Sequence, residues 1–313
     1  MNRAEQATAF RAMHITGAPL ILPNAWDAAS ARVIELEGAP AIATTSAGVA
    51  WTQGYGDGQR LSRADMIAAI RTIARTVRVP VTADIESGYG TGSVDDVTET
   101  VRAVIEAGAV GINLEDSPGR DGTPLLPAGV HVERIRAARA AAREAGLELF
   151  INARTDVYLL QVGDFETRLE ETLRRASQYL EAGADGIFVP GVQDAQLIAS
   201  LAERIPAPLN VMVGSASPNI AQLRQLGVAR VSFGPAMPRS RSRRRVEQHR
   251  RCCATGRTLG SGYVVALEAV HPRRLTTFET DGLILTPCRS SRSFPPVTSR
   301  SCADRCSPAN PRS

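Results

Sequence analysis

The sequence contains no lysine, because all 36 of its basic residues are arginine. This excludes catalysis through a lysine Schiff base and phosphate binding by a P-loop lysine. All five cysteines lie beyond residue 251, at spacings that match no zinc-binding or disulfide pattern, so the part before them has no thiol nucleophile. Apolar runs of the roughly 20 residues that a membrane span needs are absent, and the first ten residues do not resemble a signal peptide. We therefore expect a cytoplasmic protein.

Strands and helices are predicted to alternate through the first 237 residues. The expected helices cover 3–13, 27–37, 62–76, 93–107, 131–145, 165–182, 193–203 and 218–226. The expected strands cover 19–23, 40–45, 79–84, 110–114, 148–152, 185–189, 208–213 and 229–233. Eight such units over about 230 residues predict an α/β protein of the (β/α)₈, or TIM-barrel, class. A doubly wound sheet is disfavoured, because no Gly-x-Gly-x-x-Gly follows the first strand.

Charge is distributed unevenly between two parts of the chain. Residues 1–237 carry 21 arginines and 27 acidic residues, whereas residues 238–313 carry 15 arginines and 5 acidic residues. The second part is rich in Arg, Ser and Pro and lacks an amphipathic pattern, which is typical of disorder. We expect a barrel catalytic domain at 1–237 and an atypical tail at 238–313 in place of the eighth helix. An anomalous C-terminus is favoured over a basic arm for nucleic acid.

Two carboxylates end the strand predicted at 79–84. Asp84 and Glu86 precede Gly88 and Gly90, and residues i and i+2 of a strand project to the same face. Such a pair suits a hard cation with oxygen ligands, above all Mg²⁺, with Mn²⁺ as a second possibility. The alternative is a strand end whose acids only face solvent.

Further polar residues follow the other strands, and the carboxyl ends of all strands share one face of a parallel barrel. They are Thr45, Ser46, Asp57, Glu115, Asp116, Asn152, Arg154 and Asn210. The acids on this rim would repel one another unless a cation were bound. The planar guanidinium of Arg154 suits a substrate carboxylate or phosphonate, and an ion pair with Asp156 or Glu115 is the alternative.

Six segments in order resemble the isocitrate lyase/phosphoenolpyruvate mutase superfamily over about residues 15–237. They are 23–27, 44–46, 84–90, 111–116, 151–156 and 208–210. The resemblance implies a (β/α)₈ barrel, usually in a homotetramer, with Mg²⁺ bound directly by one carboxylate and through water by three others. The direct ligand would be Asp84, and the others Asp57, Glu86 and Glu115.

The resemblance also implies a substrate site. Backbone amides near Ser46 and Ala47, together with Arg154, would hold the 2-oxo acid part of the substrate, and we add Asn210 to the substrate-binding residues. Catalytic roles are expected for Arg154, Glu115 and Asp57.

The loop after the fourth strand departs from that family. Its lyases carry Lys-Lys/Arg-Cys-Gly-His there, with the cysteine as acid/base, whereas this chain has Ser-Pro-Gly-Arg-Asp-Gly-Thr-Pro at 117–124. The lysine and asparagine of the mutase and phosphonopyruvate hydrolase branches are also missing. Arg120 and Asp121 are the ionisable residues that could substitute, and a solvated turn is the alternative.

These observations favour a Mg²⁺-dependent enzyme that cleaves a C–C bond of a small 2-oxo or 2-hydroxy di- or tricarboxylate. A metal-bound keto oxygen is polarised, which stabilises the enolate formed when a bond at C3 breaks. The alternatives are C–P chemistry of the phosphoenolpyruvate mutase or phosphonopyruvate hydrolase type and a catalytically reduced ligand-binding barrel. The expected partners are a small carboxylate or phosphonate and further copies of the chain, without membrane or nucleic acid.

Overall fold

The computed structural model describes residues 1–118 and 124–235. Within these ranges nine short parallel strands form one sheet in the order β1-β9-β8-β7-β6-β5-β4-β3-β2. The strands are β1 (Leu20–Leu22), β2 (Asn24–Ala25), β3 (Ile42–Thr44), β4 (Val81–Asp84), β5 (Gly111–Glu115), β6 (Phe150–Arg154), β7 (Gly186–Val189), β8 (Leu209–Met212) and β9 (Arg230–Ser232).

The sheet closes through its first segment, which Pro23 divides into β1 and β2. Pro23 has no backbone N–H to give to a neighbouring strand, but its carbonyl accepts from the Ala43 N–H at 3.1 Å. β1 pairs with β9 on one side, and β2 pairs with β3 on the other. Counted as one segment, β1 and β2 give eight strands around a barrel, which confirms the predicted (β/α)₈ class.

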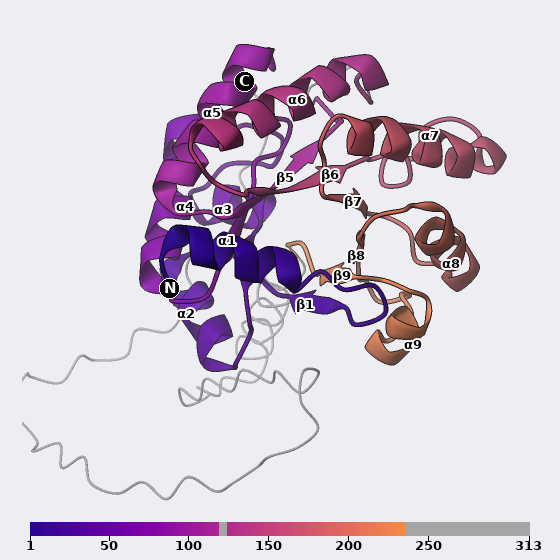
Figure 1. Cartoon of the computed structure of the whole chain (residues 1–313), viewed down its shortest axis with the longest axis horizontal. Helices are drawn as coiled ribbons and strands as arrows, with labels where there is room; N and C mark the ends of the chain where they lie inside the picture. Colours follow the sequence, from indigo (N-terminus) through magenta and orange to yellow (C-terminus); the bar gives the residue numbers. More distant parts are fainter. Residues whose placement is uncertain (119–123, 236–313) are drawn as a thin grey trace, which may run out of the picture. The chain divides into compact units, whose positions relative to one another are not determined.

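Helices surround the strands (Figure 1). They are α1 (Arg3–Ala12), α2 (Ala28–Leu36), α3 (Ser46–Thr52), α4 (Arg63–Thr76), α5 (Val94–Ala107), α6 (Ala128–Glu144), α7 (Arg168–Glu181), α8 (Ala195–Arg204) and α9 (Ile220–Gln225), with a 3₁₀ turn η1 (Phe165–Thr167) before α7. Every predicted helix is present. Asp27 caps α2 by accepting from the Ser30 N–H at 2.6 Å.

The short helix α3 was not predicted from the sequence. Thr45 caps it by accepting from the Gly48 N–H, and five of its seven residues are buried. A helix of seven residues without an exposed polar face has no amphipathic pattern to reveal it. Its consequence is functional, because it turns the backbone N–H of Ser46 toward the end of β4.

The amino-terminal end of the barrel is closed by α1 and the turn after it. Phe10 is fully buried and contacts Phe150 edge to face, with ring centroids 5.8 Å apart. His14 stacks on Phe150 at 3.9 Å and also contacts Phe10, with ring centroids 4.8 Å apart. Gly111 begins β5 directly above, where a Cβ would lie 2.8 Å from both the Phe10 ring and the Thr82 hydroxyl. These contacts fill the barrel interior near the amino-terminal ends of β5 and β6.

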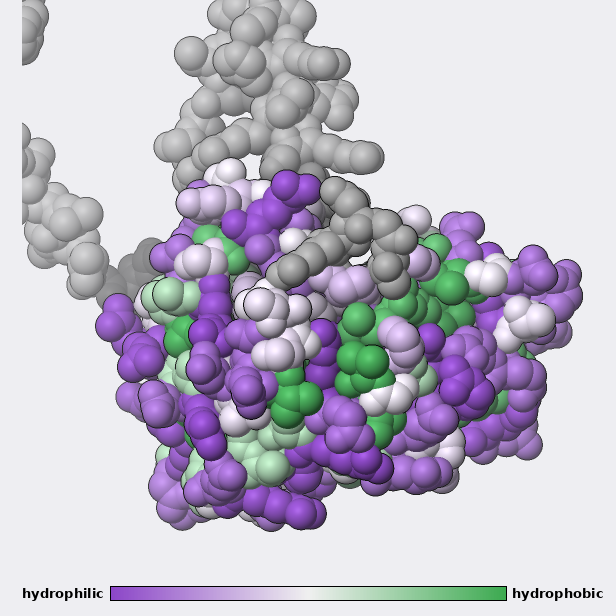
Figure 2. Space-filling view, turned by 90° about the horizontal axis from the view of Figure 1, so that it is seen from above, coloured by the Kyte–Doolittle hydropathy of each residue, from purple (hydrophilic) through white to green (hydrophobic). Residues whose placement is uncertain are grey.

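The outer surface of the described residues is mainly hydrophilic on the face that Figure 2 shows, with smaller hydrophobic areas between. Among the described residues no helix is long and apolar enough to cross a membrane. The domain boundary predicted at 237/238, the tail that follows it, and Arg120 and Asp121 all lie outside the described residues.

Candidate active site

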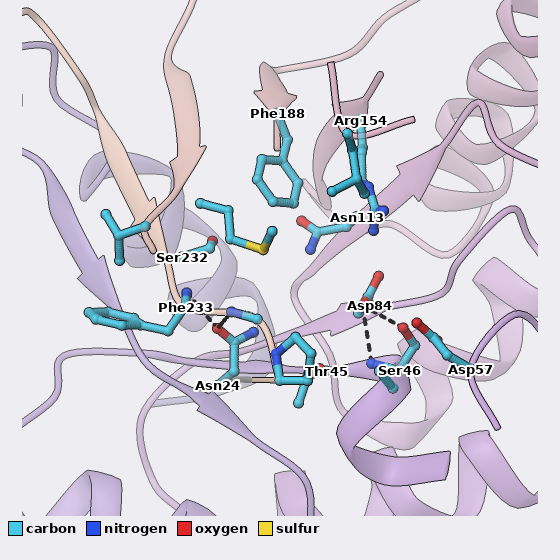
Figure 3. Close-up of a pocket in the computed structure, with 16 residues that line it drawn as sticks. Asn24, Thr45, Ser46, Asp57, Asp84, Asn113, Arg154, Phe188, Ser232 and Phe233 are labelled. Carbon is cyan, nitrogen blue, oxygen red and sulfur yellow. Dashed lines mark hydrogen bonds between the residues drawn. The ribbon is translucent and has the colours of Figure 1, made fainter. Parts of the chain in front are cut away.

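A cavity of about 340 Å³ lies at the carboxyl ends of the strands (Figure 3). It is lined by Asn24, Thr45, Ser46, Ala47, Asp57, Asp84, Asn113, Arg154, Leu159, Phe188, Met212, Val213, Ser232, Phe233, Gly234 and Pro235. Five of the predicted site residues are among them: Ser46, Ala47, Asp57, Asp84 and Arg154. The other three, Glu86, Glu115 and Asn210, are buried and absent from this lining.

Asp84 is held by the start of α3. Ser46 donates its backbone N–H and its hydroxyl to Asp84 Oδ2, at 3.1 and 2.8 Å. The Asp84 N–H in turn donates to the Thr44 hydroxyl at 2.9 Å. The second carboxylate oxygen, Oδ1, is buried and has no hydrogen-bond partner. A buried carboxylate oxygen without a donor is costly in itself, and a cation at that point would relieve the cost.

The neighbouring acids disturb one another electrostatically. Burial raises the pKa of Asp57, and the charge of Asp84 raises it further. Burial also raises the pKa of Glu86 to about 7, with added contributions from the charges of Asp84 and Asp57. A cation close to these carboxylates would relieve the repulsion that raises the pKa of Asp57 and Glu86.

Glu86 lies beyond the end of β4 and does not have a strand conformation. β4 ends at Asp84, and Glu86 adopts a left-handed conformation with φ 50°. Its two oxygens accept from the Gln59 N–H at 2.6 Å and from the Tyr89 hydroxyl at 3.0 Å. The i, i+2 rule applies only inside a strand, so Glu86 lies beside the cavity-lining acids without sharing their wall.

Arg154 carries three charge-assisted contacts. Its Nη1 lies 2.6 Å from Glu115 Oε2, while Nε and Nη2 donate to the two oxygens of Asp156 at 2.6 and 3.0 Å. Although burial disfavours its charge, the carboxylates of Glu115 and Asp156 raise the pKa of Arg154 above its usual range. Both ion-pair partners considered from the sequence are thus present, and Arg154 still lines the cavity. Burial raises the pKa of Glu115 despite this contact.

The donor set fits a hydrated Mg²⁺ better than a fully protein-coordinated metal. No three His, Cys, Asp or Glu side chains of residues 1–118 and 124–235 form a metal-binding group. Among the acids that the structure describes, Asp84 Oδ1 is the one buried carboxylate oxygen without a hydrogen-bond partner. Mg²⁺ commonly keeps several waters and takes one or two carboxylates directly. One direct ligand, with Asp57 and Glu86 reached through water, is compatible with that preference.

The sequence reasoning missed several lining residues. Asn24 accepts from the N–H groups of Phe233 and Gly234, both at 3.0 Å, which ties the first strand to the segment after β9. Asn113 lies two positions before Glu115 on β5. Strand alternation would therefore have put its side chain on the same face as that of Glu115. Both residues lie inside segments that carry the family resemblance, 23–27 and 111–116, but no role was predicted for either of them.

The cavity lining contains both polar and apolar side chains. Figure 3 shows Ser46, Asp57 and Asp84 close together, with Phe188 across from them. Leu159, Met212 and Val213 are further apolar members of the lining. Arg154 is the one cationic side chain among the described lining residues. No sequence signal identified the apolar lining residues, because each of them resembles an ordinary core residue of a strand or loop.

Comparison with known proteins shows similarity over most of the chain. The family model for phosphoenolpyruvate phosphomutase matches residues 10–251. The crystal structure of a "putative phosphonomutase" from Burkholderia cenocepacia J2315 is 44% identical, with a TM-score of 0.75, and the match covers 79% of this chain and 99% of that one. An uncharacterized protein of Mycobacterium tuberculosis H37Rv is 38% identical over 225 residues, which are 72% of this chain and 81% of that protein.

Two relatives with named activities are more distant. The oxaloacetate decarboxylase of Pseudomonas putida KT2440 is 32% identical over 184 residues, or 56% of this chain and 60% of the relative. A phosphonopyruvate hydrolase, whose crystal structure holds oxalate and Mg²⁺, is 26% identical with a TM-score of 0.70, covering 80% of this chain and 88% of that one.

Proposed function

Because this chain belongs to the phosphoenolpyruvate mutase/isocitrate lyase superfamily of enzymes, we propose that it is a Mg²⁺-dependent lyase acting on a small 2-oxo or 2-hydroxy acid. The bond broken is a C–C bond, and an enolate forms. The observation that carries the proposal is the buried Oδ1 of Asp84, which has no partner in a cavity that also presents Arg154.

Each polar group has a separate role in this proposal. Asp84 Oδ1 would hold Mg²⁺, with Asp57, Glu86 and Glu115 placed to act through its waters. When bound, the metal supplies a Lewis acid that polarises the keto oxygen of the substrate. The Ser46 N–H and hydroxyl fix the Asp84 carboxylate in one orientation, so no reorientation is needed at the moment of reaction.

Arg154 is the proposed partner of the substrate carboxylate. Glu115 and Asp156 hold its guanidinium in place, which leaves little side-chain freedom to lose on binding. Asp57 lines the cavity with a raised pKa, so it retains a proton more readily than an ordinary aspartate and is the proposed proton carrier. Asn210 lies behind Ser232, whose hydroxyl donates to it at 3.2 Å, and its substrate contact remains a proposal.

The described lining supports a narrower substrate class than the one predicted from the sequence. A di- or tricarboxylate was expected, but Arg154 is the one cationic side chain of the described lining. A third carboxylate would find no second cationic partner in the described lining, which includes the apolar Phe188, Met212 and Val213, and an unpaired charge against apolar groups is unfavourable. We therefore propose an acid with one or two carboxylates and an apolar substituent.

The second candidate is cleavage of a phosphorus–carbon bond. It is favoured by the family model and by the likeness to a phosphonopyruvate hydrolase. The test is turnover by the purified full-length chain with Mg²⁺ on isocitrate, 2-methylisocitrate, oxaloacetate and phosphonopyruvate, with products followed by NMR. Cleavage of a carbon acid that stops with EDTA supports the proposal. Phosphate release from phosphonopyruvate alone would establish the second candidate, and binding of oxalate and Mg²⁺ without any turnover would establish a binding protein.

A further inference from the structure

An arginine is buried beneath the cavity without an anionic partner. Arg230 begins β9 and is 1% exposed. Its Nη2 donates to Asn113 Oδ1 at 3.2 Å, while its Nε and Nη1 have no hydrogen-bond partner. No carboxylate of residues 1–118 or 124–235 forms an ion pair with it. An arginine side chain rarely occupies such a place, because burying a charge costs several kcal/mol.

The guanidinium remains charged at neutral pH. Burial lowers the pKa of Arg230 to about 9, and the negative charge of Asp84 opposes the change. His14 adds no second positive charge beside Arg230 at neutral pH, because burial and the charge of Arg230 lower the pKa of His14 to about 3. Arg230 is therefore a fixed cation under the floor of the site.

This cation fixes the orientation of a lining amide. Asn113 Oδ1 accepts from Arg230 Nη2 and also from Asn152 Nδ2, the latter at 2.9 Å. An arginine has donors only, so the carbonyl oxygen of Asn113 must face it and the reverse orientation is excluded. Within residues 1–118 and 124–235 the hydrogen bonds of the Asn113 side chain all go to its Oδ1, so its Nδ2 donates to none of these residues. Asn113 lines the cavity beside its register partner Asp84.

We infer that Asn113 is a substrate-binding residue, whose amide donates to an anionic oxygen of the bound 2-oxo acid, and that Arg230 is the positioning residue that holds this amide. The inference rests on the proposed function for the class of ligand. The amide of Asn113 would supply a hydrogen-bond donor to an anion near Asp57 and Asp84, whose negative charges repel an anion. The inference also gives a reason for keeping an unpaired guanidinium in the barrel.

The test is calorimetric titration of oxalate into the full-length chain with Mg²⁺ in excess. Asn113→Asp keeps the shape of the side chain and still accepts from Arg230, but it turns a charged acceptor toward the cavity. We expect the oxalate Kd to rise at least about tenfold, with no loss of thermal stability, because the new carboxylate pairs with Arg230. Asn219→Asp, the same change at the exposed cap of α9, is the control and should leave the Kd unchanged.

The positioning role has its own readout in a double-mutant cycle. Arg230→Met should weaken oxalate binding in the wild-type background but should add little in an Asn113→Ala background, since it acts through that amide. Arg230→Lys, which keeps a charged donor, should recover part of the affinity. An equal loss in both backgrounds would show that Arg230 is only structural and would overturn its positioning role.

The remaining outcomes separate the two proposals. Wild-type binding of oxalate together with an unchanged Kd for Asn113→Asp would overturn the donor role and leave the proposed function standing. Absence of oxalate binding by the wild-type chain, with Mg²⁺ present and the protein folded, would contradict the proposed function and the inference together.

Discussion

Ser46 binds one oxygen of Asp84 with two donors, its backbone N–H and its hydroxyl, and leaves the other oxygen of Asp84 buried and free. The two residues are 38 positions apart and meet only because α3 begins directly after β3. The hydrogen bonds satisfy Oδ2, whereas Oδ1 remains available to a cation. This division of roles within one carboxylate is the basis of the proposed metal site.

Removing the Ser46 hydroxyl tests that division. In Ser46→Ala the N–H still donates to Asp84, but the carboxylate is free to rotate, so we expect Mg²⁺-dependent oxalate binding to weaken about tenfold, as for loss of a hydrogen bond to a charged group. Calorimetry measures the change. Ser177→Ala is the matched control, because its hydroxyl donates to the carboxylate of Glu181 on the exposed face of α7. Equal affinity in Ser46→Ala and wild type would contradict the role given to the hydroxyl.

The raised pKa of Glu86 should make the free energy of unfolding of the metal-free protein depend on pH. Its pKa is raised to about 7 in the folded state, so the folded chain binds this proton more tightly than the unfolded chain, whose pKa is near 4.5. The contribution is therefore fully present below about pH 4.5 and is lost as pH rises through 7. Glu86→Gln should be more stable than wild type at pH 8 by about 1–3 kcal/mol, and the difference should vanish near pH 4.5.

Urea unfolding in EDTA at several pH values between 4.5 and 8 measures this difference. Glu203→Gln, an exposed change on α8, serves as the control and should show no such trend. A constant difference between Glu86→Gln and wild type across the range would show that the Glu86 carboxyl does not titrate in it.

Arg154 should not tolerate replacement by lysine. Lysine keeps the charge but cannot contact Glu115 and both oxygens of Asp156 at once, as the guanidinium does. We expect Arg154→Lys to lower the affinity for oxalate at least about tenfold and the free energy of unfolding by about 1–3 kcal/mol. Arg136→Lys, in an exposed pair with Glu133, is the control and should change both quantities little. Full oxalate affinity in Arg154→Lys would remove Arg154 from the substrate site.

Gly111 should be essential for the closed end of the barrel. In Gly111→Ala the new Cβ would lie 2.8 Å from the Phe10 ring, so α1 must shift, and we expect about 1–3 kcal/mol of destabilisation. Gly129→Ala is the control, because nothing lies within 4 Å of its Cβ in α6, and it should stabilise by about 1 kcal/mol. Thermal and urea unfolding measure both. A stable Gly111→Ala variant would mean that α1 packs less tightly on β5.

Much of the fold followed from the sequence because the helices are amphipathic and the buried strands are short and apolar. The helix ends also use residue types that suit them, with Asp27 as the cap of α2 and Gly108 in a left-handed conformation, at φ 109°, after α5. The helix α3 was not readable, since burial of most of its residues removes the polar stripe that periodicity detects.

Only the site residues at the carboxyl ends of predicted strands could be found from the sequence. Asp84 and Arg154 end β4 and β6 and were found by position alone. The orientation of Glu86 depends on a left-handed turn that strand alternation does not anticipate. The pairing of Arg230 with Asn113 joins residues 117 positions apart inside the barrel. No local pattern encodes that contact, and only the closed sheet creates it.

The central claim is that Asp84 holds Mg²⁺ through its free oxygen, and the most direct test is calorimetric titration of Mg²⁺ into the wild-type chain and into Asp84→Asn with oxalate present. Asp95→Asn, an exposed change in the first turn of α5, is the control. The account predicts that wild type and Asp95→Asn bind Mg²⁺ alike, whereas Asp84→Asn loses at least about a hundredfold in Mg²⁺ affinity, because the amide removes the charge from the one direct ligand. Mg²⁺ binding by Asp84→Asn with wild-type affinity would contradict it.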